Sequence, residues 1–282
     1  MNNKNIITID KKGKFLLDYV FDIFTNKFLI YELVKKDFKI VYAQTLLGPL
    51  FFILSPIIQS LVFTFFTNNI NIKEINGLPT FIFFLLSTTI WSFISNSVLK
   101  CSSVLLLNRK LISRIYFSRI IFFVVSILIS LIHFIINFLT LFIILFLYKF
   151  YYNNEVINFG LNVFILPFVI LLAVLFSFSV GIICASASVK YRDLAYGLPF
   201  IFQILMFLSP VLYSIKSLNG FVYTLVILNP ITSILELFRY AFINDYNFSF
   251  NVLYLNMLQI FILLISGLYF FRFIDKKIAD LI

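Results

Sequence analysis

Long uncharged stretches alternate with short charged segments along this chain. A helix needs about 20 residues to cross a bilayer, and seven stretches without Asp, Glu, Lys or Arg approach or exceed that length: 40–72, 75–99, 120–148, 156–189, 194–215, 217–235 and 246–271. The stretch 217–235 is the weakest candidate, because Asn229-Pro230 interrupts it and Asn219-Gly220 loosens its beginning. The pattern predicts an all-α, polytopic membrane protein.

The positions of the basic residues decide between six and seven spans. Six spans place 18 of the 22 Lys and Arg residues on one side of the membrane, and a seventh span would lower that number to 16. Because cytoplasmic loops are enriched in Lys and Arg, we expect six transmembrane helices with both termini in the cytoplasm. These spans are expected at about residues 45–67, 77–99, 120–148, 160–187, 195–215 and 250–271. Residues 217–239 then form a broken helical segment at the outer face, between the fifth and sixth spans.

An N-terminal amphipathic helix is predicted just before the first span. Between residues 29 and 41, Phe38 and other apolar side chains share one face, while Glu32, Lys35 and Lys36 lie on the other. This helix could anchor the chain at the membrane interface or dock a cytoplasmic partner. The sequence thus divides into a cytoplasmic extension, residues 1–27, and a membrane domain, residues 28–282.

Composition excludes several classes of protein. Of the 282 residues, 62% are hydrophobic and only 12% are charged, whereas soluble domains carry about 25% charged residues. The net charge of +10 is distributed between apolar stretches rather than on one solvated face, so it does not predict nucleic-acid binding. The two cysteines, Cys101 and Cys184, are too few for a disulfide scaffold.

The sequence also lacks the patterns of an enzyme or a metal site. It has no G-x-x-x-x-G-K motif, so any ATP must be hydrolysed by another chain. The one histidine, His133, has no metal-ligating neighbours in sequence and is expected to pack neutral inside a span or to form a hydrogen bond with a neighbouring helix. The expected span cores contain no charged residue, which disfavours an ion-coupled carrier and a membrane glycosyltransferase. We therefore expect no cofactor on this chain.

Small residues mark one helix face for close packing. Ala173, Ser177, Gly181 and Ala185 recur every four residues. Such a stripe lets a neighbouring helix approach closely in a membrane. We interpret it as a structural feature.

Five short motifs occur in a fixed order. They are YAQTLLGP at 42–49 followed by Pro56, LISRIYFSR at 111–119, KYRD at 190–193, LSPVLY at 208–213, and Asn229-Pro230 with Glu236 and Arg239. In this order and spacing, the chain resembles type-2 ABC exporter permeases. More narrowly, it resembles the branch that exports bacterial cell-surface polysaccharides: O-antigen, capsule and teichoic acid. The family usually has Phe-Pro-Arg where this chain has Phe117-Ser118-Arg119.

The resemblance implies a permease subunit in the bacterial inner (plasma) membrane rather than an enzyme. Two copies would form a channel for a lipid-linked glycan and pair with two copies of an ATPase subunit, which would bind ATP and Mg. A loop after the second span would couple to that ATPase through Arg109, Lys110, Leu111, Ile112, Arg114, Tyr116, Phe117 and Arg119. A second cytoplasmic loop would contain Lys190, Tyr191, Arg192 and Asp193. An outer gate would contain Pro210, Tyr213, Asn229, Pro230, Glu236 and Arg239.

Two other functions stay open at this point. One is a type-2 ABC exporter of drugs or lipids; the short outer loops and the Ser-Pro-Val-Leu-Tyr motif favour the glycan branch over it. The other is a membrane enzyme acting on polyprenyl sugars, which the lack of carboxylate pairs in the spans disfavours. Within the resemblance, we expect Glu236 and Arg239 to pair on one helix face, and Leu111 and Tyr116 to anchor in the partner subunit.

Overall fold

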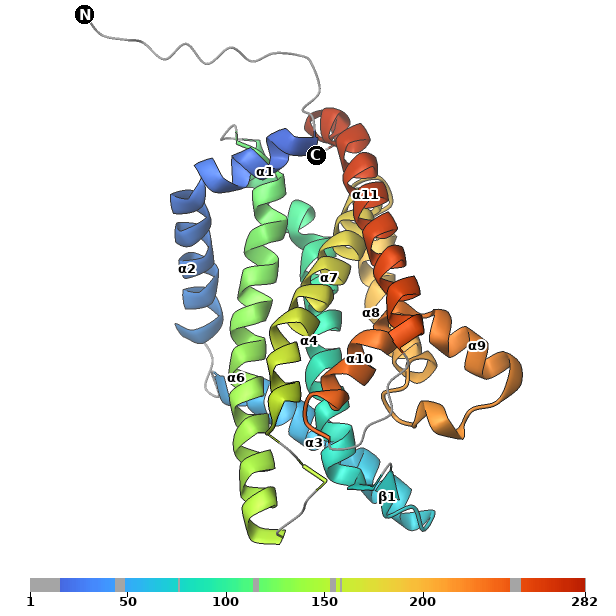
Figure 1. Cartoon of the computed structure of the whole chain (residues 1–282). Helices are drawn as coiled ribbons and strands as arrows, with labels where there is room; N and C mark the ends of the chain where they lie inside the picture. Colours follow the sequence, from blue (N-terminus) through green and yellow to red (C-terminus); the bar gives the residue numbers. More distant parts are fainter. Residues whose placement is uncertain are drawn as a thin grey trace, which may run out of the picture.

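The chain folds into one bundle of long helices (Figure 1). The computed structural model describes residues 16–43, 49–75, 77–113, 117–152, 156–157, 159–243 and 250–281. Helix α4 (Thr80–Leu107) lies at the centre and packs against α3 (Pro49–Asn69), α6 (Ile120–Tyr152) and α7 (Leu166–Lys190). On the other side of α7 lies α11 (Phe250–Leu281). Helix α4 is apolar around most of its circumference, which suits the centre of a bundle.

Glycines set the closest approaches within the bundle. A Cβ atom added to Gly181 of α7 would lie 2.5 Å from Cβ of Cys101 in α4. A Cβ added to Gly267 of α11 would lie 3.0 Å from the carbonyl oxygen of Ser179 in α7. The predicted small-residue stripe of α7 is buried, so it forms part of these contacts. Helices α4 and α11 can therefore approach α7 closely, because Gly181 and Gly267 carry no side chain at the two contacts.

The described residues contain four helices long and apolar enough to cross a membrane. These are Thr80–Leu107, Ile120–Tyr151, Leu161–Lys190 and Asn251–Asp275, and a bent helix pair could add a fifth. The sequence predicts six spans, of which the fifth corresponds to α8 (Asp193–Leu208). Helix α8 has 16 residues, about 24 Å at 1.5 Å per residue, which is shorter than a hydrocarbon core of about 30 Å. The expected first span includes residues 45–48, which lie outside the described residues.

Helix α4 continues beyond the expected second span. That span is expected at about residues 77–99, and the helix runs to Leu107. Lys100, the first residue after the expected span, is half-buried against α6, where its Nζ lies 3.0 Å from Nδ1 of His133. The segment that connects α4 to α6 therefore begins at residue 108.

Two helices precede the bundle. In Figure 1, α1 (Leu16–Thr25) lies across one end of the bundle and α2 (Lys27–Ala43) lies alongside α6. Ile30 of α2 is buried against α6, while the predicted charged face is exposed at Glu32, Lys35 and Lys36, and Phe38 is half-buried. The placement of α2 at a membrane surface stays a prediction.

Part of the expected N-terminal extension packs onto the bundle. Tyr19 of α1 is buried, and its ring centroid lies 5.7 Å from that of Phe271 in α11. The sequence does not predict this contact, because Tyr19 and Phe271 are far apart in the chain. Helix α1 therefore belongs structurally with the bundle.

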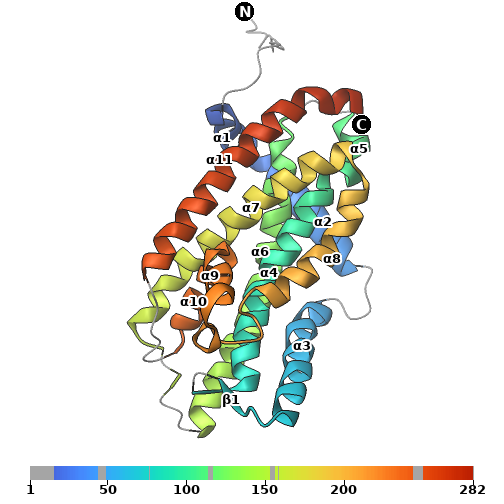
Figure 2. The same cartoon turned by 90° about the vertical axis from the view of Figure 1, so that its right-hand side faces the viewer.

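Two short strands lie at the other end of the bundle, and two 3-10 turns lie in the connections between its helices. Strands β1 (Glu74–Ile75) and β2 (Leu78–Pro79) pair antiparallel, with Gly77 at φ 76° in the turn. The 3-10 turns η1 (Leu161–Ile165) and η2 (Ile215–Ser217) lead into α7 and toward α9 (Gly220–Leu228). Figure 2 shows β1 at the end of the bundle opposite α5 (Arg109–Ile112).

We expect Gly181→Ala to destabilise the protein, because its new Cβ would clash with that of Cys101. Overpacking of this kind costs about 1–3 kcal/mol, which should lower the thermal unfolding temperature in detergent. Gly197→Ala is the control, since a Cβ at Gly197 of α8 meets no atom within 4 Å. Equal unfolding temperatures for the two variants would contradict the close α4–α7 packing.

Candidate functional site

A bent helix pair forms the framework of the candidate outer gate. Helices α9 and α10 (Pro230–Tyr240) meet at an angle of 85° at Asn229. The side-chain Oδ1 of Asn229 accepts a hydrogen bond from the backbone N–H of Ile231 at 3.0 Å, and Pro230 occupies the first helical position. An Asn cap followed by proline is a favourable helix start. The predicted break at Asn229-Pro230 is therefore present.

The two halves of the pair differ in their surroundings. Helix α10 packs against α4, α7 and α11, and its residues from Ile231 to Arg239 are buried. In α9, the side chains from Phe221 to Leu225 are exposed. Figure 1 shows α10 within the bundle and α9 projecting from its side. Helix α10 is thus packed inside the bundle, whereas most side chains of α9 are exposed.

Arg239 joins three elements at the end of α10. Its side chain is fully buried, and Nη1 donates to Oε1 of Glu236 at 2.8 Å. Its Nε and Nη2 donate to the hydroxyl oxygen of Ser87 in α4 at 3.1 and 2.6 Å. Nη2 also donates to the backbone carbonyl of Pro210, just after α8, and the guanidinium lies 4.0 Å from the ring centroid of Phe83. A buried charge needs such partners, so α10, α4 and the turn after α8 are held together here.

A second set of polar contacts fixes the bend itself. Asn229 Nδ2 donates to the hydroxyl of Ser209 at 2.9 Å. From α11, Asn256 Nδ2 donates to the hydroxyl of Ser233 at 2.5 Å and to the carbonyl of Ile227 at 3.2 Å. These bonds connect both halves of the bent pair to the turn after α8 and to α11.

The structure brings together most of the predicted gate residues. Glu236 and Arg239 pair as expected, Pro210 supplies a carbonyl, and Asn229 and Pro230 form the bend. Tyr213 is not part of the ion-pair cluster; its hydroxyl donates to the carbonyl of Leu208 at 3.1 Å. Ser87, Phe83 and Asn256 were not predicted to support the gate, and Ser209 was noted only as part of the LSPVLY motif. Ser87 and Asn256 are polar residues inside otherwise apolar stretches, but spacing alone could not pair them with Arg239 or Ser233.

At the opposite end of the bundle, α5 presents a charged face. Arg109 and Lys110 are exposed, whereas Leu111 and Ile112 are half-buried and pack against buried residues of this chain. Leu111 covers part of the protein's own core and is only half-buried, so its anchoring in a partner stays a prediction. Arg114 and Tyr116 lie outside the described residues.

The end of the loop that contains α5 is bonded to α11, and α1 contacts the same carboxylate of α11. Arg119 Nη1 lies 2.6 Å from Oδ1 of Asp275, and the hydroxyl of Tyr19 donates to Oδ2 of that carboxylate at 3.4 Å. Burial and the nearby carboxylate raise the pKa of Tyr19, so its hydroxyl stays protonated and can donate. Phe117 is half-buried, with its ring centroid 5.2 Å from that of Phe122. Arg119 and Phe117 thus make contacts within the chain.

The second predicted cytoplasmic loop is short and exposed. Lys190 ends α7, and its Nζ lies 5.0 Å from the ring centroid of Tyr191. Tyr191 and Arg192 are exposed, and Asp193 begins α8, where a carboxylate favours the helix start. The structure therefore leaves these side chains available to solvent.

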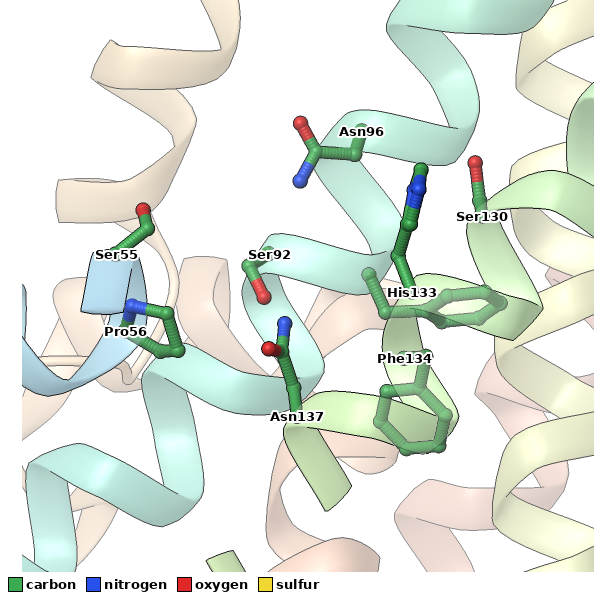
Figure 3. Close-up of a pocket in the computed structure, with 9 residues that line it drawn as sticks. Ser55, Pro56, Ser92, Asn96, Ser130, His133, Phe134 and Asn137 are labelled. Carbon is green, nitrogen blue, oxygen red and sulfur yellow. The ribbon is translucent and has the colours of Figure 1, made fainter. Parts of the chain in front are cut away.

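A polar cavity between α3, α4 and α6 was not predicted. It has a volume of about 110 Å³ and is lined by Ser55, Pro56, Ser92, Phe93, Asn96, Ser130, His133, Phe134 and Asn137 (Figure 3). His133 was expected to pack neutral; in the structure it is buried beside Lys100. Within the described part of the chain, no group of three His, Cys, Asp or Glu side chains could hold a metal ion.

We expect Arg239→Gln to destabilise the protein strongly. Removing one partner of a buried ion pair costs about 3–5 kcal/mol, and here it also removes bonds to Ser87 and Pro210. Arg192→Gln, the same change at an exposed arginine, should stay within about 0.5 kcal/mol. Denaturant unfolding of both variants in detergent measures the difference, and a stability of Arg239→Gln close to that of Arg192→Gln would refute the role of the cluster.

Comparison with known proteins agrees with this architecture. The profile of the ABC-2 type transporter family matches residues 29–243, which is most of the chain. The chain is also 22% identical to the O-antigen export system permease protein RfbA of Klebsiella pneumoniae over 274 residues, covering 96% of this chain and 99% of that protein. The resemblance seen in the sequence motifs is thereby confirmed, and it identifies a multi-pass membrane transporter subunit rather than an enzyme. The chain belongs to the ABC-2 type transporter family.

Proposed function

We propose that this chain is the permease subunit of an ABC transporter that exports a lipid-linked polysaccharide across the bacterial inner membrane. O-antigen or lipopolysaccharide is the first candidate cargo, and capsule or teichoic acid are related ones. The observation that carries the proposal is the similarity to an O-antigen export permease over nearly the full length of both chains. In this proposal two copies form the channel, both termini are cytoplasmic, and two copies of a separate subunit bind ATP and Mg.

The geometry of the bent pair supports a gate with one fixed and one moving part. Separating Arg239 from its partners would leave a charge buried without compensation, so α10 stays in place against α4. Most side chains of α9 are exposed, and this half can change position about Asn229 at little loss of packing. We assign α10 as the part of the outer gate that stays in place and α9 as the part that moves.

At the cytoplasmic end, the charged face of α5 is the proposed docking site for the ATPase subunit. Arg109 and Lys110 are exposed there, and complementary charge on a partner would speed and orient association. The pair Arg119–Asp275 connects the end of this loop to α11. Movement of the docked loop would therefore reach α11, and α11 contacts both α9 and α10.

Deletion of the gene in its native host tests the function. We expect loss of the surface polysaccharide and accumulation of its lipid-linked form inside the cell, both reversed by the intact gene. An inactive copy of the ATPase subunit should give the same result, because the proposed export requires ATP hydrolysis. Unchanged surface polysaccharide together with lost drug or phospholipid export would instead establish the alternative ABC exporter.

A separate prediction concerns the charged face of α5, the proposed docking site for the ATPase subunit. We expect the double variant Arg109→Glu and Lys110→Glu to co-purify about tenfold less ATPase subunit at low salt, because it reverses charge at an electrostatic contact. Lys73→Glu is the control, since Lys73 is exposed near β1 at the opposite end of the bundle. Asp275→Asn should retain the ATPase subunit but weaken the dependence of its hydrolysis rate on the permease. Equal co-purification of the double variant and the control would remove α5 from the proposed interface.

A further inference from the structure

A polar seam runs along the interface between α4 and α6. It consists of Ser92, Asn96, Lys100 and Ser103 on α4 and Ser126, Ser130, His133 and Asn137 on α6. Within each helix these residues are three or four positions apart, so they share one face. The two faces meet where Lys100 Nζ contacts His133 Nδ1 at 3.0 Å. Because a protonated lysine can only donate, His133 accepts at Nδ1.

The seam opens into two cavities. The cavity of about 110 Å³ seen in Figure 3 lies between α4 and α6 and is bordered by Ser55 and Pro56 of α3. It contains Oδ1 of Asn137, a buried oxygen without a hydrogen-bond partner among the described residues. The second cavity, of about 270 Å³, lies between α2, α4 and α6. One water molecule needs about 10–15 Å³ by this measure, so the second cavity can hold a substantial chemical group.

Lys100 places a positive charge on the wall of the larger cavity. The Lys100 side chain is half-buried. Asp37 of α2 lines the same cavity and attracts Lys100 electrostatically, although among the described residues no direct ion pair joins Lys100 to a carboxylate. Burial raises the pKa of the Asp37 carboxyl. A lysine within a candidate span is expensive and usually serves a function.

Hydroxyl groups next to Lys100 can also donate to a ligand. Ser103 Oγ now donates to the carbonyl of Leu99 at 3.2 Å, and Ser126 Oγ donates to that of Phe122 at 3.0 Å. Both carbonyls lie inside helices, where the backbone N–H four residues later is their regular partner. Either hydroxyl can therefore turn toward a bound group without leaving a carbonyl unpaired.

The depth of Lys100 suits the head group of a lipid. Helix α4 has 28 residues and so spans about 42 Å, close to the thickness of a bilayer with its head groups, about 40–45 Å. Lys100 precedes the end of α4 by about 10 Å, which places it near the boundary between head groups and hydrocarbon. The cavity also carries apolar side chains at Ile40, Val104, Leu107 and Ile129. A cation beside an apolar wall at this depth matches a phosphate joined to an acyl or prenyl chain.

We propose that the cavity between α2, α4 and α6 binds the phosphate head group of a membrane lipid, with Lys100 as its counter-ion. Ser103 and Ser126 donate hydrogen bonds to the phosphate, and the lipid chain follows the apolar wall into the bilayer. This site goes beyond the proposed function and does not rest on it, because a phosphate-bearing lipid can bind any membrane protein that presents such a cavity.

Retention of defined lipids by the purified full-length chain tests this site. The protein is exchanged into a neutral detergent, and binding of phosphatidic acid, polyprenyl phosphate and diacylglycerol is measured by native mass spectrometry. We expect both phosphate-bearing lipids to bind at least about tenfold more tightly than diacylglycerol, because only they offer a charge-assisted bond to Lys100. Preference for polyprenyl phosphate over phosphatidic acid would identify a carrier-lipid site, and equal binding would identify a resident phospholipid site. Diacylglycerol binding as tightly as the other two would overturn the proposal.

Charge variants test whether Lys100 binds an anion or has only a structural role. Lys100→Gln should weaken phosphatidic acid binding about tenfold, whereas Lys73→Gln, the same change at an exposed lysine, should leave it unaltered. Asp37→Asn should strengthen binding several-fold, since it removes a negative charge from the cavity. Lys100→Arg preserves the charge and should retain binding. Retained binding in Lys100→Arg would show that the loss in Lys100→Gln comes from the missing charge and not from misfolding. Weaker binding in Asp37→Asn, or unchanged binding in Lys100→Gln, would refute the anion site.

Discussion

The buried guanidinium of Arg239 is the constraint on which the arrangement of α10, α4 and the turn after α8 depends. An arginine without access to water must find acceptors for its donors, and here Glu236, Ser87 and the carbonyl of Pro210 supply them. These acceptors come from α10, α4 and the turn after α8. One charge thereby fixes the relative positions of three segments that are distant in sequence. The bend itself begins locally at the Asn229 cap and Pro230, and the Arg239 cluster holds the α10 half inside the bundle.

Helix α4 connects the Arg239 cluster with the end of the bundle near α5. Ser87 contacts Arg239, and Lys100 contacts His133 of α6. Directly after Lys100 the helix is packed closely against α7, where Gly181 leaves room for Cys101. A rigid helix in contact with both ends is suited to carry displacement between them, since interior packing has few voids to absorb it.

The end of the bundle near α5 is organised around a second ion pair, Arg119–Asp275. Asp275 receives bonds from Arg119 and Tyr19, so α11, the end of the loop that contains α5, and α1 meet at one carboxylate. The apolar side of α5 rests on the bundle and its charged side is exposed. Any partner that binds the exposed side would act on a loop already tied to α11. The same arrangement explains why α1 packs with the membrane domain rather than forming a separate extension.

Hydrophobic patterning by itself determined that this chain is helical and membrane-embedded, because uncharged stretches of bilayer length have few alternatives. The Asn229-Pro230 dipeptide located the bend, and i, i+3 spacing located the pair Glu236–Arg239, since both act locally. Only the tertiary structure decided that α4 continues past Lys100, that Leu111 covers the protein's own core, and that Ser87 and Asn256 hold α10 and the bend in place. Each of these depends on a neighbour from another helix, and periodicity within one segment carries no information about which helix that is.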